Sequence, residues 1–562
     1  MRKIAFIGLI VACATAAMAV PAKPGPTVIT EADGTERTVY LHGDEFFHYM
    51  TLADGKWVEM QSGRLATVPA LSEEEIATRH DQQQAAAAPL RAPAATTQAI
   101  PLNIAPRGLI ILAQFTDLEF RAANTLEAFQ EMYDSEDYSF NGATGSAKKY
   151  FEDQSFGQYS PEFEVVGPVT VSNSHSYYGA NDHWGNDSRP NELIIEACRL
   201  ADTEWDIDFT QYDNDNDGFI DFVYVIYAGR GEADGGPTTT IWPHTSYIYE
   251  RFGQTIYLDG KKLNTYACSN ELRTVTDGMI STARCGIGTF CHEFSHVLGL
   301  MDHYSTNSSN TSKQTGDWDL MCSGSYNNGG NTPAAYTAYE RFYMGWGTPV
   351  ILNEAVTIDS MQPIATSGEM YLISEDGTSN LVGNDPNPTT FYMLENRYQI
   401  GWDCYVPGNG LIITKIQYNY QKWKSNSVNA SASSPGYDII EADGKTPTLY
   451  EQGGLGKIGD AFPYTKTNSF SPYEHYPITD IKRNEGGTIF FKFMGGNDVI
   501  SVIAKERALE LYGEDFTEIV GVYDAAGHLI HGATSLNDLS QGMYIIAVSN
   551  GKKTKGVKLC IP

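Results

Sequence analysis

Along the middle of the chain, segments with the hydrophobic pattern of β-strands alternate with segments that have the pattern of amphipathic helices. Continuous apolar runs of strand length occupy Gly108–Phe115 and Phe222–Ala228, and Glu162–Val171 is also typical of a strand. Other stretches have the apolar spacing of amphipathic helices. The predicted helices lie near 145–153, over about 190–203, over about 287–300 and near 333–344. Because strands and helices alternate, residues 105–349 are predicted to form a mixed α/β domain.

The pattern changes on both sides of this domain. Residues 20–81 hold short alternating pieces that predict a small strand-rich module. Residues 82–104 are rich in Ala, Pro, Gln and Thr and show neither the helical nor the strand pattern of apolar residues. We therefore expect an exposed linker, a common place for proteolytic processing. Further along, short strands separated by turn signals predict a β-sandwich over 350–495, and residues 496–562 are predicted to be another β-rich module.

The first residues have the pattern of an export signal. A basic start and the apolar run Ile4–Ala17 are followed by small residues, and a cut before Val20 would remove residues 1–19 as a signal peptide. A lipoprotein cleavage box ending at Cys13 is the alternative interpretation. No other apolar run approaches the roughly 18–20 residues of a transmembrane helix. We therefore expect a secreted or cell-surface protein without a membrane span.

Composition narrows the class further. The chain has 562 residues, of which 42% are hydrophobic, enough to fill several cores and to exclude wholesale disorder. Lys and Arg number 38 against 69 Asp and Glu, for a net charge of −31. A field of this sign repels phosphate backbones and anionic lipid, so nucleic acid is not an expected partner.

In the oxidising compartment that export implies, the cysteines could form disulfides, but the sequence does not fix their pairing. Eight cysteines are present, and seven remain if the signal peptide is removed. Cys268 with Cys285, and Cys291 with Cys322, are candidate disulfide bridges around the central region. Cys198 lies in an apolar helical stretch and is predicted to be a buried free thiol.

The strongest chemical signal is the sequence Cys291-His-Glu-Phe-Ser-His-Val-Leu-Gly-Leu-Met-Asp302. On a helix its apolar residues share one face, whereas His292, Glu293 and His296 project from the other. Imidazoles four residues apart can chelate Zn²⁺, and the adjacent carboxylate can hold the water that the metal activates. Glu293 would act as general base and then pass the proton to the leaving amine. The sequence therefore predicts a zinc peptidase.

A catalytic zinc needs a third protein ligand and an open position. Gly299 can end the helix and turn the chain so that Asp302 reaches the metal, a metzincin spacing with Asp in place of the usual His. His303 is the alternative ligand. Met321, in Asp-Trp-Asp-Leu-Met, is the candidate Met-turn residue beneath the zinc, and Tyr326 is predicted to hydrogen-bond the tetrahedral oxyanion.

A second metal signal lies in the loop Asp213-Asn-Asp-Asn-Asp-Gly-Phe-Ile-Asp221. Oxygen side chains at alternate positions and a glycine for the tight turn match the first nine places of an EF-hand-type loop, although the twelfth-position Glu is missing. The sequence predicts a structural Ca²⁺ site at the start of a strand, with a plain acidic turn as the alternative. Its ligands would be the Phe219 carbonyl and the carboxylates of Asp213, Asp215, Asp217 and Asp221.

Several strings together resemble one family. With HEFSHVLGLMDHY, DWDLMCSGSY, IWPHTSY and the Asp-rich loop leading into DFVYVIYAGRGE, the chain resembles the immune inhibitor A family of secreted metallopeptidases over about residues 38–475. The resemblance implies a zinc endopeptidase with an N-terminal propeptide, a metzincin-like catalytic domain and a following β-sandwich. It also implies ligand and base roles for His292, Glu293 and His296. Family members commonly have an acidic residue where this chain has His303, which leaves Asp302 and His303 both open as third ligand.

The C-terminal string VYDAAGHLI…GKKTKGVKLCIP looks like the sorting domains that engage the type nine secretion machinery, and a further small binding module is the alternative. We therefore predict a secreted zinc endopeptidase, made as a latent precursor, that cleaves extracellular proteins or glycoproteins. The competing class is a surface adhesin or glycan-binding protein with a degenerate peptidase domain. Residues 20–81 contain no cysteine to cap a zinc, so latency is expected from steric or carboxylate blockade.

Overall fold

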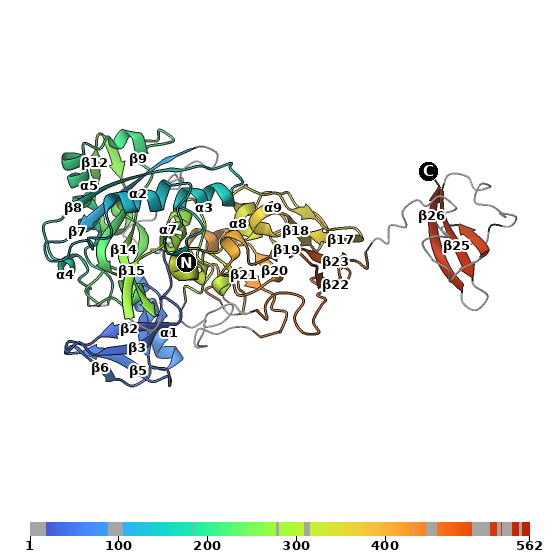
Figure 1. The fold of residues 1–562 in the computed structure, drawn as a ribbon, viewed down its shortest axis with the longest axis horizontal. Helices are drawn as coiled ribbons and strands as arrows, with labels where there is room; N and C mark the ends of the chain where they lie inside the picture. Colours follow the sequence, from blue (N-terminus) through green and yellow to red (C-terminus); the bar gives the residue numbers. More distant parts are fainter. Residues whose placement is uncertain are drawn as a thin grey trace, which may run out of the picture. The chain divides into compact units, whose positions relative to one another are not determined.

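The computed structural model (Figure 1) describes residues 18–87, 105–183, 185–276, 280–307, 315–431, 433–445 and 458–496, and farther on Ile530 and three strands. The chain divides into two compact units, Met1–Glu354 with Ile358–Met494, and Ala355–Thr357 with Gly495–Pro562. Most of the predicted signal peptide, and residues 88–104 of the predicted linker, lie outside the described residues. Among the helices of the described part, none has the length and apolar character needed to cross a membrane.

A mixed sheet forms the centre of the α/β domain. Its strand order is β1-β11-β14-β10-β7-β8, and β15 pairs with the far part of β14. The strands β7, β8, β10 and β14 run parallel, whereas β1, β11 and β15 are antiparallel to their neighbours. The bounds are β1 (Met18–Ala19), β7 (Arg107–Gln114), β8 (Glu162–Thr170), β10 (Val223–Arg230), β11 (His244–Tyr247), β14 (Thr265–Thr276) and β15 (Ile280–Arg284).

Alternating side chains of the parallel strands fill two cores, one on each face of the sheet. Ile110 and Leu112 of β7 pack on the face covered by α2 (Leu126–Asp134), α3 (Ala147–Gln154) and α7 (Gly288–Val297). Their neighbours Leu109 and Ile111 face α5 (Pro190–Trp205). Both faces are apolar, as a parallel sheet between helices requires, and Figure 1 shows the helices flanking it. The predicted mixed α/β class is confirmed.

The N-terminal module is an antiparallel meander followed by a helix. Its sheet has the order β2-β3-β4-β5-β6 and a small core of Ile29, Val39 and Val58. The bounds are β2 (Pro26–Thr30), β3 (Glu36–Gly43), β4 (His48–Thr51), β5 (Trp57–Gln61), β6 (Arg64–Thr67) and α1 (Glu73–Ala87). Strand β2 lies against β14 of the central sheet (Figure 1), so this module packs directly on the α/β domain.

The region that follows the α/β domain is rich in strands. One sheet has the order β16-β18-β19-β20-β21 and another has β17-β23-β22; farther on, β24, β25 and β26 form an antiparallel sheet. The bounds are β16 (Val350–Ile351), β17 (Val356–Met361), β18 (Met370–Ser374), β19 (Thr390–Arg397), β20 (Gly410–Gln417), β21 (Tyr437–Ile439), β22 (Ile478–Arg483), β23 (Ile489–Phe493), β24 (Glu518–Asp524), β25 (Gly542–Ser549) and β26 (Thr554–Ile561). The role of the last three strands as a sorting domain stays a prediction.

Two predicted boundaries were wrong. The predicted linker begins inside α1, which continues to Ala87 because Ser72 caps its start, Ile76 is buried and alanine favours helix at its end. The helix predicted near 333–344 is shorter, since α8 spans only Ala338–Tyr343 after the capping box that Thr337 forms with Glu340.

Both predicted disulfide pairings were also wrong. All six cysteines in the described part carry free thiols: Cys198, Cys268, Cys285, Cys291, Cys322 and Cys404. Cys285 accepts a hydrogen bond from Asn270, and Cys268 lies 3.8 Å from a ring nitrogen of His244. Spacing along the chain did not reveal that the members of each pair face different neighbours.

Candidate metal centre and active site

Helix α7 presents two histidines to one point inside the domain. His292 and His296 are buried, and their Nε2 atoms lie 3.2 Å apart. His292 Nδ1 lies 2.8 Å from the carbonyl of Leu320, and His296 Nδ1 lies 2.9 Å from that of Leu300. A carbonyl can only accept a hydrogen bond, so each Nδ1 carries the proton. Both Nε2 lone pairs are therefore left to face the same point.

A turn after α7 brings a carboxylate to that point. The helix ends at Val297, and Gly299 has a φ of 102°, a conformation that side chains with a Cβ rarely adopt. Asp302 Oδ1 then lies 3.1 Å from Nε2 of His292 and 3.2 Å from Nε2 of His296. Burial opposes ionisation, but the two imidazoles hold the pKa of Asp302 below its usual range. Asn426 fixes the turn by accepting from the Asp302 amide at 2.8 Å.

These three atoms have the spacing of metal ligands. A tetrahedral zinc with bonds of about 2.0–2.1 Å places its ligand atoms about 3.3 Å apart, close to the 3.1–3.2 Å edges of this triangle. The Nε2 lone pairs of His292 and His296 and the Asp302 Oδ1 atom all face one point, and none of these three atoms carries a proton. Asp302 Oδ1 also has no hydrogen-bond donor among the described residues. The side chains fit one divalent cation.

His303, the alternative ligand, lies in a neighbouring cluster. Its Nδ1 is 2.7 Å from Asp319 Oδ2, and its ring stacks on Tyr437 at 4.2 Å between centroids. Glu340 is the third member of this buried cluster. Burial, together with the Asp319 charge, raises the pKa of Glu340 well above the usual range. The geometry therefore favours Asp302 over His303 as the third candidate ligand.

Glu293, the candidate base, lies beside the triangle and is held on both carboxylate oxygens. Oε2 accepts from the Thr245 hydroxyl at 2.7 Å, and Oε1 accepts from the Val20 amide at 3.0 Å. Burial raises the pKa of Glu293 to about 8, although the neighbouring His292 and the two hydrogen bonds oppose the shift. Thr245, on β11, was not predicted from the sequence, and it orients the carboxylate.

The Val20 amide belongs to a segment that crosses the site as a peptide. Met18 and Ala19 form β1, which pairs antiparallel with β11 in the register Met18 to Thr245 and Ala19 to His244. Beyond β1, the Trp242 indole donates to the Val20 carbonyl at 3.0 Å. Ala19 and Val20 are fully buried. The peptide bond between them lies directly against Glu293.

Two tyrosines contact carbonyls of this segment. The Tyr304 hydroxyl donates to the Ala19 carbonyl, the carbonyl of the peptide bond next to Glu293. The Tyr326 hydroxyl donates to the Pro21 carbonyl at 2.8 Å, two residues farther on. Tyr326 was the predicted oxyanion donor, but the carbonyl of the peptide bond next to Glu293 is contacted by Tyr304. Its place two residues after Asp302 was the signal in the sequence, and 34 tyrosines obscured it.

The N-terminal module also brings a carboxylate near the triangle. Glu45 is half-buried, and its buried Oε2 atom lacks a hydrogen-bond partner in the described part. Burial raises its pKa well above the usual range, and the charges of Asp44, Asp302 and Glu293 add to the shift. The neighbouring Asp44 accepts from the buried His80 of α1 at 2.9 Å, which ties this loop to the helix.

Met321 lies in the main core and is fully buried. Its amide donates to Asp319 Oδ1 at 2.8 Å, and its carbonyl accepts from the His303 amide at 2.8 Å. The preceding Leu320 carbonyl holds His292. The turn therefore supports the triangle through its backbone, and the role of the Met321 side chain as an apolar floor stays a prediction.

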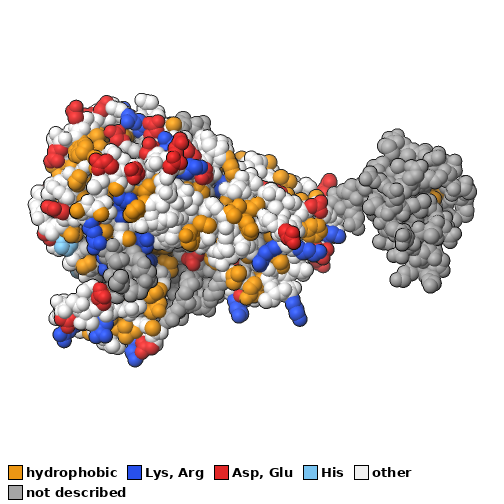
Figure 2. All heavy atoms as spheres, viewed as in Figure 1, with side chains coloured by type: hydrophobic (Ala, Val, Ile, Leu, Met, Phe, Trp, Pro, Cys, Tyr) orange, Lys and Arg blue, Asp and Glu red, His pale blue; other side chains and the backbone are white. Residues whose placement is uncertain are grey.

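The acidic loop gathers the four predicted carboxylates. Asp213, Asp215, Asp217 and Asp221 each offer an oxygen, all within 4.8 Å of one another. Lys261 Nζ lies 2.5 Å from Asp213 Oδ2, and burial raises the pKa of Asp221 to about 6. Figure 2 shows acidic side chains gathered on this face, over α5, β9 (Phe219–Ile220) and β12 (Ile256–Leu258). The Phe219 carbonyl as a ligand stays a prediction.

Comparison with known proteins identifies the α/β domain. Residues 111–346 match the model of the immune inhibitor A peptidase M6 catalytic domain. The chain is 27% identical over 271 residues to the pre-pro-metalloprotease PrtV of Vibrio cholerae serotype O1, covering 44% of this chain and 29% of that protein. It is 26% identical over 252 residues to immune inhibitor A of Bacillus thuringiensis subsp. alesti, covering 37% of this chain and 36% of that protein. The chain thus spans about a third of the length of these relatives.

Proposed function

We propose that the chain is a secreted zinc endopeptidase made as a latent precursor, because residues 111–346 match the immune inhibitor A peptidase M6 catalytic domain. One observation carries the proposal. A segment of the chain itself crosses the candidate metal triangle as a peptide, with the amide of Val20 3.0 Å from Glu293 Oε1. That is the position of a scissile peptide bond beside a general base.

In this proposal His292, His296 and Asp302 hold the zinc. Bound there, zinc would polarise the scissile carbonyl and lower the pKa of a water molecule. Glu293 takes the proton of that water and delivers it to the amide nitrogen that leaves, the nitrogen that Val20 now presents to Oε1. Thr245 keeps the carboxylate aimed at that nitrogen. Strand β11 aligns the substrate backbone as it aligns β1.

Metal dependence is the first test of this function. We expect the processed enzyme to cleave casein, to lose that activity on prolonged treatment with a zinc chelator, and to regain it with added Zn²⁺. Cleavage that persists with less than one zinc per ten molecules would contradict the zinc assignment. Zinc binding without cleavage of casein or of a glycoprotein panel would favour the alternative, an adhesin or glycan-binding protein with a degenerate peptidase domain.

Tyr304 is proposed as the oxyanion donor in place of Tyr326. Its hydroxyl already meets the carbonyl beside the Glu293-bound amide. We expect Tyr304→Phe to lower kcat by about 100-fold with little change in KM, because removal of one oxyanion donor costs about 10²–10³ in kcat. Tyr326→Phe, the matched control, should change mainly KM, since Tyr326 contacts a carbonyl two residues away. Equal losses in kcat for the two variants would contradict this assignment.

Latency is proposed to come from the N-terminal module, residues 20–81. After removal of the signal peptide, residues 20–23 still contact Glu293, Trp242, Tyr326 and Asp234, and so occupy the position of a substrate. Glu45, from the loop between β3 and β4, adds a buried carboxylate close to Asp302. Cutting within residues 88–104 would release both. This is the steric and carboxylate blockade expected in the absence of a cysteine.

The acidic loop is proposed as a structural calcium site that fastens the start of β9. We expect 1 mM Ca²⁺ to raise the Tm by several degrees, because a ligand at 100 times its Kd stabilises by about 2.7 kcal/mol. Asp217→Asn keeps an oxygen for the Phe219 amide but loses the charge, and should abolish most of this rise. Asp208→Asn, a change of exposed carboxylate outside the loop, should preserve it. An equal rise in both variants would contradict the site.

Secretion is proposed from the predicted signal peptide together with the names of the relatives, one of which is a pre-pro-metalloprotease. The substrates would be extracellular proteins or glycoproteins. An interaction of the C-terminal β-rich module with the secretion machinery remains part of the proposal.

A further inference from the structure

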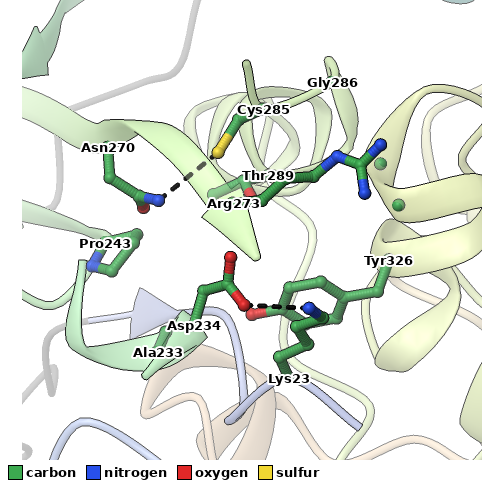
Figure 3. Close-up of a pocket in the computed structure, with 12 residues that line it drawn as sticks. Lys23, Ala233, Asp234, Pro243, Asn270, Arg273, Cys285, Gly286, Thr289 and Tyr326 are labelled. Carbon is green, nitrogen blue, oxygen red and sulfur yellow. Dashed lines mark hydrogen bonds and ion pairs between the residues drawn. The ribbon is translucent and has the colours of Figure 1, made fainter. Parts of the chain in front are cut away.

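A pocket beside the candidate active site holds the side chain of Lys23. The Lys23 ammonium lies 3.0 Å from Asp234 Oδ1, and the exposed fractions of the two side chains are 15% and 7%. Figure 3 shows the ammonium joined to this carboxylate by a dashed line, and Tyr326 also lines the pocket. The other walls include Asn270, Arg273, Cys285 and Thr289.

The pocket has a defined place relative to the candidate scissile bond. Val20 presents its amide to Glu293 and is therefore the first residue after that bond. The next contacts follow in order along the segment: Tyr326 donates to the Pro21 carbonyl, and the Lys23 amide donates to the Ala233 carbonyl at 2.9 Å. Lys23 is thus the fourth residue after the bond. A substrate running in the same direction would place its own fourth residue in this pocket.

The charges in the pocket favour a cation at that position. Asp234 is largely buried, and a cation at ion-pair distance, here Lys23, stabilises a buried carboxylate. Arg230 also lies near, and its guanidinium donates to the backbone carbonyl of Asp234 at 2.6 Å. Cys285 adds no negative charge, because burial first and the Asp234 charge second raise the pKa of its thiol above the usual range. Arg273 lies along the opposite wall, where its guanidinium packs close to Gly329. Departure of the N-terminal module would leave Asp234 facing the incoming peptide.

The space in the pocket suits either basic side chain. A cavity of about 30 Å³ remains among its lining residues, room for about two water molecules. An arginine head, which is larger than an ammonium, can take up that space by displacing water. An aliphatic side chain of the same length would not form the ion pair that Lys23 makes with Asp234.

We propose that this pocket is a specificity subsite, and that Asp234 makes the peptidase prefer lysine or arginine as the fourth residue on the carboxyl side of the cleaved bond. The proposal rests on the proposed peptidase function, because the cleaved bond defines the position. It makes Lys23 a substrate-like side chain of the precursor, and basic protein segments the preferred substrates.

The test uses the processed enzyme, obtained from the full chain by limited proteolysis, and a set of fluorogenic peptides. The peptides differ only at the fourth position after the cleaved bond, which carries Lys, Arg, Met, Gln or Glu. We expect kcat/KM to be at least tenfold higher for Lys and Arg than for Met. Asp234→Asn should reduce this ratio to about one. Glu204→Gln, an exposed change of the same kind on α5, should keep the full preference.

Several results would overturn the subsite. They are equal rates for Lys and Met in the parent enzyme, a preference for Glu, or a preference for Lys that survives Asp234→Asn.

A binding measurement separates this proposal from the proposed function. A labelled peptide with the sequence of residues 18–26 and its Lys23→Met counterpart are titrated into the processed Glu293→Gln variant. Tighter binding of the Lys peptide by about tenfold, lost with Asp234→Asn, supports the pocket even if no peptide is ever cleaved. Equal binding of both peptides overturns the pocket whether or not the enzyme is a peptidase.

Discussion

Glu293→Gln is expected to lower peptide cleavage by about three orders of magnitude while the zinc content stays that of the parent. The glutamine keeps the shape of the side chain and an oxygen for the Thr245 hydroxyl, which now bonds Oε2 at 2.7 Å. It cannot accept a proton from water, and general acid–base catalysis by one side chain contributes about 10²–10⁴ in rate. Metal analysis of both proteins, beside rates on casein and a fluorogenic peptide, checks both halves of the prediction.

Thr245→Val is the matched control, because it removes only the threonine hydroxyl that hydrogen-bonds Glu293 and leaves the carboxylate in place. Its hydroxyl lowers the pKa of Glu293, so its loss raises that pKa. The carboxylate form then prevails only at higher pH. The acid limb of the pH–rate profile should move to higher pH, with a loss of about tenfold in cleavage rate near neutrality.

Activity of Glu293→Gln within tenfold of the parent, or loss of its zinc, would remove Glu293 from the role of base.

The core of the site was predictable because it lies in one stretch of chain. The helical spacing of His292, Glu293 and His296 places all three on one face of α7, and the positive φ of Gly299 is the turn that a glycine at that place permits. The parallel strands were equally predictable, because a continuous apolar run of strand length is typical of a strand buried on both faces of a sheet. The local sequence pattern was therefore enough to predict the parallel strands, the helix α7 and the three site residues on it.

The choice between Asp302 and His303 depends on contacts that no local pattern contains. Asn426, more than 120 residues away, bonds both the amide and the carboxylate of Asp302. Asp319 and Tyr437 hold His303 in the other direction. Two adjacent residues, each a plausible ligand, were separated only by partners brought in through tertiary structure.

The same reason explains the residues that sequence reasoning missed. Thr245 and Trp242 look like ordinary members of a strand and a loop, and gain their role because β11 forms the edge that receives β1. The segment around Val20 looked only like the end of a signal peptide. Its second role, as a peptide lying against Glu293, requires a pairing across more than 220 residues.

That second role makes the segment the strongest expected determinant of latency. We compare two chains that both lack residues 1–19: one begins at Val20 and the other at Pro24. The second chain keeps the meander β2–β6 and its core of Ile29, Val39 and Val58, but loses every contact that residues 20–23 make with Glu293, Trp242, Tyr326 and Asp234. We expect it to cleave fluorogenic peptides without processing, about 100-fold faster than the chain that begins at Val20.

The magnitude follows from tethering. A segment joined to its site acts at an effective concentration in the millimolar range, so even a weak affinity of about 10 μM keeps the site closed in about 99 of 100 molecules. The free peptide of residues 20–26 should accordingly inhibit the second chain with a Kd in the micromolar range and restore latency only at much higher concentration.

A control and a contrary result complete the argument. Glu59→Ala alters an exposed residue of β5 in the same module and should leave the chain that begins at Val20 latent. If the chain that begins at Pro24 stays latent as well, the segment is not the barrier. The loop that carries Glu45 then closes the site by itself. Glu45→Ala added to that chain should release the activity, because Glu45 lies close enough to the site for the charges of Asp302 and Glu293 to raise its pKa. The order in which the two changes release activity therefore ranks the segment against the carboxylate as the cause of latency.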